Sequence, residues 1–328
     1  MRTYKYDWEN PEVFKKNKED GHVIAFSYDN EQDALDRIEP KTKLTLNGTW
    51  KFHWQRGLED CPEDFYKEDF DASFWRDITV PSVWQTEDTG SYPYYYASTF
   101  CRAFSRSKSK IPSIDHSMQE IGIYVRDFTM PDNFDGNEIF LHFGAAKSAI
   151  EVYVNGNFVG YSQGSMTPHE FDITKYARKG ENRVAVKVYR FSDGSYLENQ
   201  DMWLLCGLYR EVYVFCEPKK CLRDFFITTD LDKNYKDSKT SLDLTLKNYG
   251  ETGIVKVKAE VVDGDERILL GETDTAVNSN TVTLHLEKNI ENPKKWSAET
   301  PYLYKLLISV TADGKTTYKC IRFGFKKV

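Results

Sequence analysis

The sequence lacks the features that mark membrane, secreted and nucleic-acid-binding proteins. Among its 328 residues, no apolar run approaches the roughly 20 residues of a membrane-spanning helix. The first 19 residues are rich in Lys, Glu and Asp, without the apolar core of a signal peptide. The net charge is −7 and no basic stripe is present, which argues against binding to nucleic acid or to an anionic membrane. We expect a cytoplasmic protein; the alternative is a secreted one whose signal peptide has been trimmed.

Cysteine is scarce, and none of the six residues forms a CxxC pair. A chain of this length buries a sizeable core without cross-links, so we expect free, buried thiols in a reducing compartment rather than disulfides. Cys206 has no obvious His partner nearby and is interpreted as a buried apolar residue, not a nucleophile.

The common catalytic motifs are also missing. The sequence contains no GxSxG, no P-loop, no HExxH and no GxGxxG after a strand. Its six His residues lack the paired spacing of metal ligands and are expected to be structural. Hydrolysis of a glycoside needs two facing carboxylates, and no convincing pair stands out. The residues alone therefore indicate a possible ligand loop and no catalytic pair, and we interpret the basic stretch 102–110 as a solvated loop.

What the sequence has in abundance is aromatic residues, 15% of the total, and alternating apolar positions. Both are typical of β-structure. In the first part, Leu44 to Trp54 alternate around Asn47-Gly48, a strong hairpin signal, and a second such turn is expected at Asn155-Gly156. Further strands are predicted at 77–85, 120–131, 138–162, 181–191 and 208–218. Their spacing favours a sandwich or jelly roll.

The periodicity restarts after Pro218-Lys219-Lys220. Seven strands in about a hundred residues suit an immunoglobulin-like sandwich, and they are predicted at 222–231, 241–249, 253–263, 266–273, 281–288, 302–311 and 316–325. The sequence thus predicts an all-β protein. It would have an arm at 1–40 with room for a short helix near Glu31–Arg37, a jelly-roll domain at 41–218, and an immunoglobulin-like domain at 219–328.

The stretch 191–212 has the highest concentration of candidate ligand-binding residues. It combines Asp193, Glu198 and Asp201 with Trp203 and with tyrosines. Carboxylates accept hydrogen bonds from sugar hydroxyls, and aromatic rings stack on the apolar faces of sugars. The alternative interpretation is a surface loop in which Trp203 anchors the core.

Within this stretch, SDGSYLENQDMWLLCGLYREV (192–212) resembles the signature of the LacZ-type β-galactosidases of glycoside hydrolase family 2. DWENPEVF (7–14) resembles the family's amino-terminal arm. LNGTWKFHW (46–54), VPSVWQ (80–85) and the stretch 152–195 resemble its sugar-binding domain, a galactose-binding-like jelly roll. ENPKKWSAETPYLYKLLISV (291–310) and FGFKKV (323–328) resemble the immunoglobulin-like domain that follows.

The resemblance implies a larger parent, since in the family a TIM barrel carrying the catalytic glutamates follows directly after this point. A barrel needs about 250 residues, so we predict that this chain alone does not hydrolyse galactosides. The implied parent is a retaining β-galactosidase of carbohydrate metabolism. It would act on a lactose-like galactoside, form a homo-oligomer, and need sodium and magnesium, whereas this part holds no cofactor of its own. β-Glucuronidase and β-mannosidase fit the signature less well.

Residue by residue, the resemblance implies that Asp201 contacts the galactosyl unit and is one ligand of a sodium ion. Without barrel-supplied ligands, that cation site should be weak or empty. Trp203 would pack under the loop, and Arg210 would pair with an acidic neighbour such as Glu198 or Glu211.

One departure concerns the region YPYYYASTFCRAF (92–104). Here Ala97 stands where the family carries a sugar-contacting Asn, and Ser98 would serve if the register slips by one. This leaves the favoured galactoside open. Two other hypotheses remain: a stand-alone, non-catalytic carbohydrate-binding protein, and a structural protein in which the sandwiches serve assembly.

Overall fold

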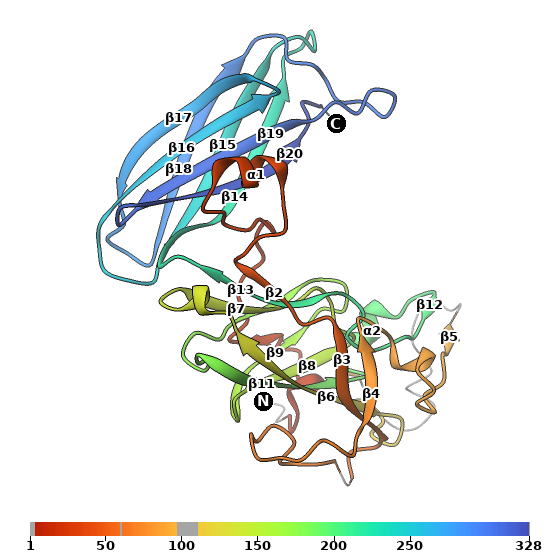
Figure 1. The fold of residues 1–328 in the computed structure, drawn as a ribbon. Helices are drawn as coiled ribbons and strands as arrows, with labels where there is room; N and C mark the ends of the chain where they lie inside the picture. Colours follow the sequence, from red (N-terminus) through yellow and green to blue (C-terminus); the bar gives the residue numbers. More distant parts are fainter. Residues whose placement is uncertain (1–3, 60, 97–110, 328) are drawn as a thin grey trace. The chain divides into compact units, whose positions relative to one another are not determined.

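The computed structural model describes residues 4–59, 61–96 and 111–327. The chain divides into two compact units (Figure 1). The first comprises Met1–Asp20, Leu44–Asp135 and Ile139–Phe215. The second comprises Gly21–Lys43, Gly136–Glu138 and Cys216–Val328. The expected all-β fold, a jelly-roll sandwich followed by an immunoglobulin-like one, is confirmed.

Two sheets form most of the first unit. The seven-stranded sheet has the order β1 (Lys15–Lys16), β9 (Asn157–Gln163), β8 (Ala149–Val154), β11 (Gly180–Tyr189), β6 (Glu120–Met130), β3 (Gly48–Arg56) and β4 (Arg76–Val80). The four-stranded sheet has the order β10 (His169–Asp172), β7 (Glu138–Phe143), β13 (Val212–Glu217) and β2 (Lys43–Thr45). The remaining elements are β5 (Tyr95–Tyr96), β12 (Met202–Trp203), α2 (Ser195–Glu198), η1 (Asp7–Glu9), η2 (Trp84–Thr86) and η4 (Asp132–Phe134).

Strand β6 shows how the first unit buries its larger sheet. Its first six residues are all buried, because both faces of the strand are covered. On one face, Ile121 and Ile123 pack in a cluster with Trp8 of the amino-terminal arm. On the other face, a Cβ at Gly122 would come within 2.3 Å of the Trp84 ring, so only glycine fits beneath that ring. The first part of the arm, around Trp8, and η2 are therefore parts of the packed unit.

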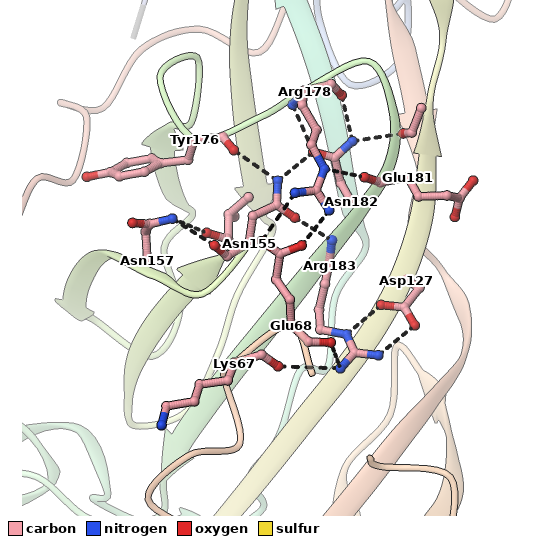
Figure 2. Close-up of polar contacts among 12 residues, drawn as sticks. Lys67, Glu68, Asp127, Asn155, Asn157, Tyr176, Arg178, Glu181, Asn182 and Arg183 are labelled. Carbon is pink, nitrogen blue, oxygen red and sulfur yellow. Dashed lines mark hydrogen bonds and ion pairs between the residues drawn. The ribbon is translucent and has the colours of Figure 1, made fainter. Parts of the chain in front are cut away.

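The Asn155-Gly156 dipeptide forms the predicted hairpin between β8 and β9. Both residues have positive φ, 48° and 77°, which this tight turn requires. The Asn155 amide donates to the Tyr176 carbonyl (2.9 Å) and to Asn182 Oδ1 (2.8 Å), and its Oδ1 accepts from the Arg183 amide (2.8 Å) (Figure 2). The turn residue thus also links two other parts of the unit, the segment at Tyr176 and strand β11.

The hairpin predicted at Asn47-Gly48 is wrong. Strand β2 ends before this dipeptide and β3 begins at Gly48, but the two strands belong to different sheets. Asn47 Oδ1 accepts from the Val212 amide (2.8 Å), and Arg126 donates to the Leu46 carbonyl (2.9 Å). These tertiary contacts turn the chain from one sheet into the other, so the same dipeptide forms a corner of the sandwich.

Arg183 on β11 holds the segment 67–70 against the seven-stranded sheet (Figure 2). Its guanidinium makes two bonds to the Asp127 carboxylate, at 2.7 and 2.9 Å. It also donates to the carbonyls of Lys67 (3.4 Å), Glu68 (3.0 Å) and Phe70 (2.7 Å). A single side chain therefore satisfies three backbone carbonyls of a loop.

The second unit contains the seven predicted strands. One sheet has the order β14 (Lys220–Leu231), β15 (Ser238–Asn248) and β18 (Thr281–Ile290). The other has the order β17 (Glu266–Ala276), β16 (Ile254–Asp263), β19 (Tyr304–Ala312) and β20 (Lys315–Phe323). Alternate residues of both sheets, such as Leu244, Val257 and Ile308, meet in one apolar core, as expected for a sandwich.

The segment 21–43 belongs to the second unit and includes α1 (Glu31–Asp36), which confirms the short helix expected there. A cluster of buried polar side chains holds this segment. Lys319 pairs with Glu217 at 2.7 Å and donates to the Ala25 carbonyl at 2.9 Å, while the Ser27 hydroxyl donates to Glu217 at 2.6 Å. The domain limits 41–218 and 219–328 stay predictions.

Candidate functional site

The signature stretch 191–212 folds as a loop at the end of β11. After the single turn of α2, Asp201 adopts a left-handed backbone conformation with φ of 49°. The chain then forms the short strand β12, which pairs antiparallel with β5 (Figure 1). The structure thus brings the signature loop beside Tyr95–Tyr96.

The Asp201 carboxylate is held by a tyrosine from β5. The Tyr95 hydroxyl donates to Asp201 Oδ1 at 2.9 Å. This bond raises the pKa of Tyr95, because the carboxylate stabilises the protonated phenol. Both side chains are exposed. The arrangement presents an oriented carboxylate to solvent, which is suited to accept hydrogen bonds from ligand hydroxyls.

Trp203 does not pack under the loop, and it is not a core anchor. Its side chain is 55% exposed, and its ring lies beside Tyr95 with the ring centroids 5.4 Å apart. Neighbouring residues of a strand point to opposite faces, and Met202 points to the inner side, where the Lys147 ammonium contacts its sulfur at 3.5 Å. The prediction of a buried Trp203 is therefore wrong.

Glu198 and Arg210 both contact the turn at residues 165–166. Glu198 accepts from the amide and hydroxyl of Ser165, at 3.0 and 2.6 Å. Arg210 donates to the Met166 carbonyl at 3.3 Å. The predicted ion pair between Arg210 and Glu198 is therefore wrong, since both side chains have other partners. The pairing with Glu211 stays a prediction.

A buried arginine behind the site was missed by the sequence analysis. Arg190 has no exposed surface. Its Nη1 donates to Glu120 Oε1 (2.7 Å) and Ser91 Oγ (2.9 Å), and its Nη2 donates to the carbonyls of Tyr92 (2.7 Å) and Leu204 (3.0 Å). It thus contacts both loops that meet at Asp201.

A signal for this arginine is present in the sequence. Val184, Val186 and Val188 occupy the alternate, buried positions of β11, and Arg190 continues that series. An arginine at a position with core periodicity needs a buried partner, and Glu120 begins the neighbouring strand β6. The spacing alone did not show which loops the guanidinium would bind.

The VPSVWQ segment lies beside the end of the signature. The Trp84 amide donates to the Cys206 carbonyl at 3.0 Å, and Gln85 Oε1 accepts from the Cys206 amide at 2.9 Å. Gln85 Nε2 also donates to Ser91 Oγ at 3.0 Å. Burial raises the pKa of the Cys206 thiol to about 11, so the thiol stays protonated. This confirms Cys206 as a buried apolar residue.

The other described cysteines, Cys61, Cys216, Cys221 and Cys320, are also free, as expected. Two histidines have structural partners inside the unit: His142 lies 2.8 Å from Glu170, and His169 lies 2.6 Å from Ser162. Ala97, the alternative Ser98 and the basic stretch 102–110 lie outside the described residues.

We tested whether the residues around Asp201 fit a cation. Over residues 4–59, 61–96 and 111–327, no three His, Cys, Asp or Glu side chains gather in a way that could hold a metal ion. Asp201 offers one carboxylate, already bonded to Tyr95. A sodium ion there would need further oxygen ligands beside the Asp201 carboxylate. In the same described ranges, no helix has the length and apolar character needed to cross a membrane.

Comparison with known proteins supports the resemblance. The family model described as "Glycosyl hydrolases family 2, sugar binding domain" matches residues 44–218, and the model "Glycosyl hydrolases family 2" matches residues 221–326. A β-galactosidase of Priestia megaterium is 35% identical over 93% of this chain, and one of Clostridium acetobutylicum is 35% identical over 98%. The chain spans 30% and 35% of the lengths of these two relatives.

Solved structures show the same fold at lower identity. A Bacteroides uniformis β-glucuronidase 2 bound covalently to cyclophellitol-6-carboxylate aziridine matches 87% of this chain and 32% of its own, with a TM-score of 0.68 and 22% identity. A Bifidobacterium dentium β-glucuronidase complexed with coumarin-3-O-glucuronide matches 89% of this chain and 50% of its own, with a TM-score of 0.65 and 18% identity. From the two family models and these relatives, the chain belongs to glycoside hydrolase family 2.

Proposed function

We propose that this chain is the amino-terminal portion of a retaining β-galactosidase and that its Asp201 loop forms part of the active-site mouth. The observation that carries the proposal is the exposed Asp201 carboxylate, oriented by Tyr95 at 2.9 Å within the family signature. Relatives that are 35% identical over most of the chain and are named β-galactosidase support this substrate class over a glucuronide.

In this proposal Asp201 accepts hydrogen bonds from hydroxyls of the galactosyl unit. Tyr95 fixes the carboxylate through one oxygen, so the other is directed toward the ligand. A charge-assisted hydrogen bond to a hydroxyl is stronger than a neutral one. The sodium ion implied by the resemblance would take Asp201 as one oxygen ligand, with the others supplied from outside this chain.

We assign the bond-breaking chemistry to the barrel of the full-length protein. A retaining glycosidase uses one carboxylic acid to protonate the leaving oxygen and a second carboxylate to form the glycosyl-enzyme. This chain alone would then release no product. We further propose a lactose-like substrate, a magnesium requirement, a homo-oligomeric state and a cytoplasmic location for the full-length protein.

The test is the substitution Asp201→Asn in the full-length protein. The variant should show a kcat/KM on a nitrophenyl galactoside at least about 10-fold lower than the wild type, because a charge-assisted bond to the sugar is lost. It should also lose the response to added sodium. Asp127→Asn, on the surface of the same unit, is the matched control. Unchanged kinetics of Asp201→Asn at low and high sodium would overturn the role of Asp201, and a faster turnover of the nitrophenyl glucuronide would overturn the substrate class.

The isolated chain distinguishes the remaining hypotheses. We expect no nitrophenol release above buffer from the isolated chain. Saturable binding of galactose or lactose without any family activity in the full-length protein would instead favour a stand-alone carbohydrate-binding protein. A solution mass well above 38.2 kDa without sugar binding would favour a structural protein.

A further inference from the structure

We propose that Arg190 is a positioning residue for the Asp201 site: its buried guanidinium determines where Asp201 and Tyr95 stand relative to each other. This inference rests on the proposed function for its catalytic consequence, although its structural part can be measured without activity. Arg190 touches neither the ligand nor the reacting atoms, and it acts through two backbone segments.

The two terminal nitrogens of the guanidinium have different partners. Nη1 binds Glu120 Oε1 at 2.7 Å. Glu120 is itself fixed at the start of β6, where it also accepts from Trp54 Nε1 at 3.2 Å and lies 3.5 Å from Arg56. The carboxylate partner of Arg190 therefore belongs to the rigid sheet, whereas the second partner of Nη1, Ser91 Oγ at 2.9 Å, directly precedes Tyr92 in the loop.

The other terminal nitrogen contacts both segments of the site. Arg190 Nη2 donates to the Tyr92 carbonyl at 2.7 Å and to the Leu204 carbonyl at 3.0 Å. Tyr92 lies three residues before Tyr95, and Leu204 lies three residues after Asp201. The Leu204 amide in turn donates to the Tyr94 carbonyl at 2.7 Å. The two segments are thus joined to each other and to one guanidinium.

This geometry needs an arginine. The planar guanidinium presents its donors in a fixed fork, whereas a lysine ammonium is a point charge on a flexible stem. A lysine at 190 retains the positive charge opposite Glu120 but cannot hold the same fork towards both carbonyls. Arg190→Lys therefore distinguishes two roles of Arg190. It keeps the ion pair that stabilises the fold and loses the hydrogen bonds that position the loops.

The experiment measures local order in this chain by amide hydrogen exchange. In Arg190→Lys, we expect exchange of the segments 92–96 and 201–205 to be about 10- to 100-fold faster, because the loops open more often when these bonds are lost. Peptides of β14 should be unchanged. Arg183→Lys is the matched control, since Arg183 also binds loop carbonyls; it should loosen 67–70 and leave 201–205 as in the wild type.

A second readout follows Tyr95 directly. The Tyr95 phenol, assigned in spectra of ¹³C-labelled tyrosine by comparison with Tyr95→Phe, should titrate above the ordinary pKa in the wild type. In Arg190→Lys its pKa should fall towards about 10, the value of a free tyrosine, because the bond to Asp201 is no longer held. A role confined to fold stability would lower the melting temperature and leave this pKa unchanged.

The outcomes are separable from the proposed function. The positioning role is overturned if Arg190→Lys shows the same exchange at 201–205 and the same Tyr95 pKa as the wild type. This holds whatever activity the full-length protein has. If Arg190→Lys does not fold, Ser91→Ala, which removes the loop partner of Nη1, should produce the same local effects at smaller size. In the full-length protein, Arg190→Lys should lower kcat/KM about 10-fold. If the exchange and titration results hold but no galactosidase activity exists, only the proposed function fails.

Discussion

Two arginines of the first unit, Arg183 on β11 and Arg190 directly after its end, hold loops at different depths. Arg183 binds the loop at 67–70 near the surface, where its side chain is 18% exposed and that of Asp127 is 56% exposed. Arg190 binds the loops around Asp201 in the interior, where its side chain and that of Glu120 are 0% and 2% exposed. Both guanidiniums pair with one carboxylate and donate to backbone carbonyls.

The difference shows what burial adds to the same chemistry. Near the surface, water competes for each partner, so an ion pair contributes little. In the interior, both ions have lost their hydration, and removing one leaves the other uncompensated. We infer that the Arg183 contacts contribute little to the stability of the fold. The buried Arg190 contacts contribute more and restrain the loops of the proposed site.

The largest effect is expected from Glu120→Gln. This change leaves the buried Arg190 without a counter-charge and should destabilise the fold by about 3–5 kcal/mol. Urea unfolding of the variant and of Asp127→Asn, the corresponding change at the surface pair, measures the contrast. A cost for Glu120→Gln no greater than that for Asp127→Asn would remove the distinction between the two arginines.

An intermediate effect is expected from Arg183→Gln. The variant loses the bonds to Asp127 and to the carbonyls at 67–70, which remain accessible to water, so we expect a loss of about 1–2 kcal/mol. Limited trypsin digestion at Lys67 should be faster than in the wild type. Cleavage that instead increases after Arg210, the first trypsin site that follows Asp201, would show that the two loops are not independent.

The smallest effect is expected from Asp127→Asn. A half-exposed ion pair contributes about 0.2–1 kcal/mol and is screened by salt. The difference in stability from the wild type should therefore shrink as sodium chloride is raised to about 1 M, where the Debye length is about 3 Å. A difference that stays constant with salt would mean that Asp127 acts through packing or hydrogen bonding and not through its charge.

Alternation of apolar residues predicted most of the strands, because a strand with one buried face repeats every two residues. It also located the seven strands of the second unit, whose core is built from such positions. Local turn chemistry was less reliable. Asn155-Gly156 forms a hairpin and Asn47-Gly48 a corner, since the contacts to Val212 and Arg126 come from residues far away in the sequence.

The sequence likewise predicted only part of the candidate site. The signature identified Asp201 from residue order alone, and the structure gave it Tyr95 as a partner from a segment more than a hundred residues earlier. The resemblance implied that Trp203 packs under the loop, yet the pairing of β12 with β5 leaves it at the surface. Arg190 continues the buried series of β11, but the spacing does not show which loops its guanidinium binds.

By itself, the sequence determined the all-β class, the strand periodicity and the family, because these depend on local patterns and on residues read in order. Only the tertiary structure decided which loops meet at Asp201, that Trp203 faces solvent, and that Arg190 lies behind the site. The physical reason is that a hydrogen bond or ion pair between distant segments depends on how the sheets pack, and the spacing of residues along one strand does not specify that packing.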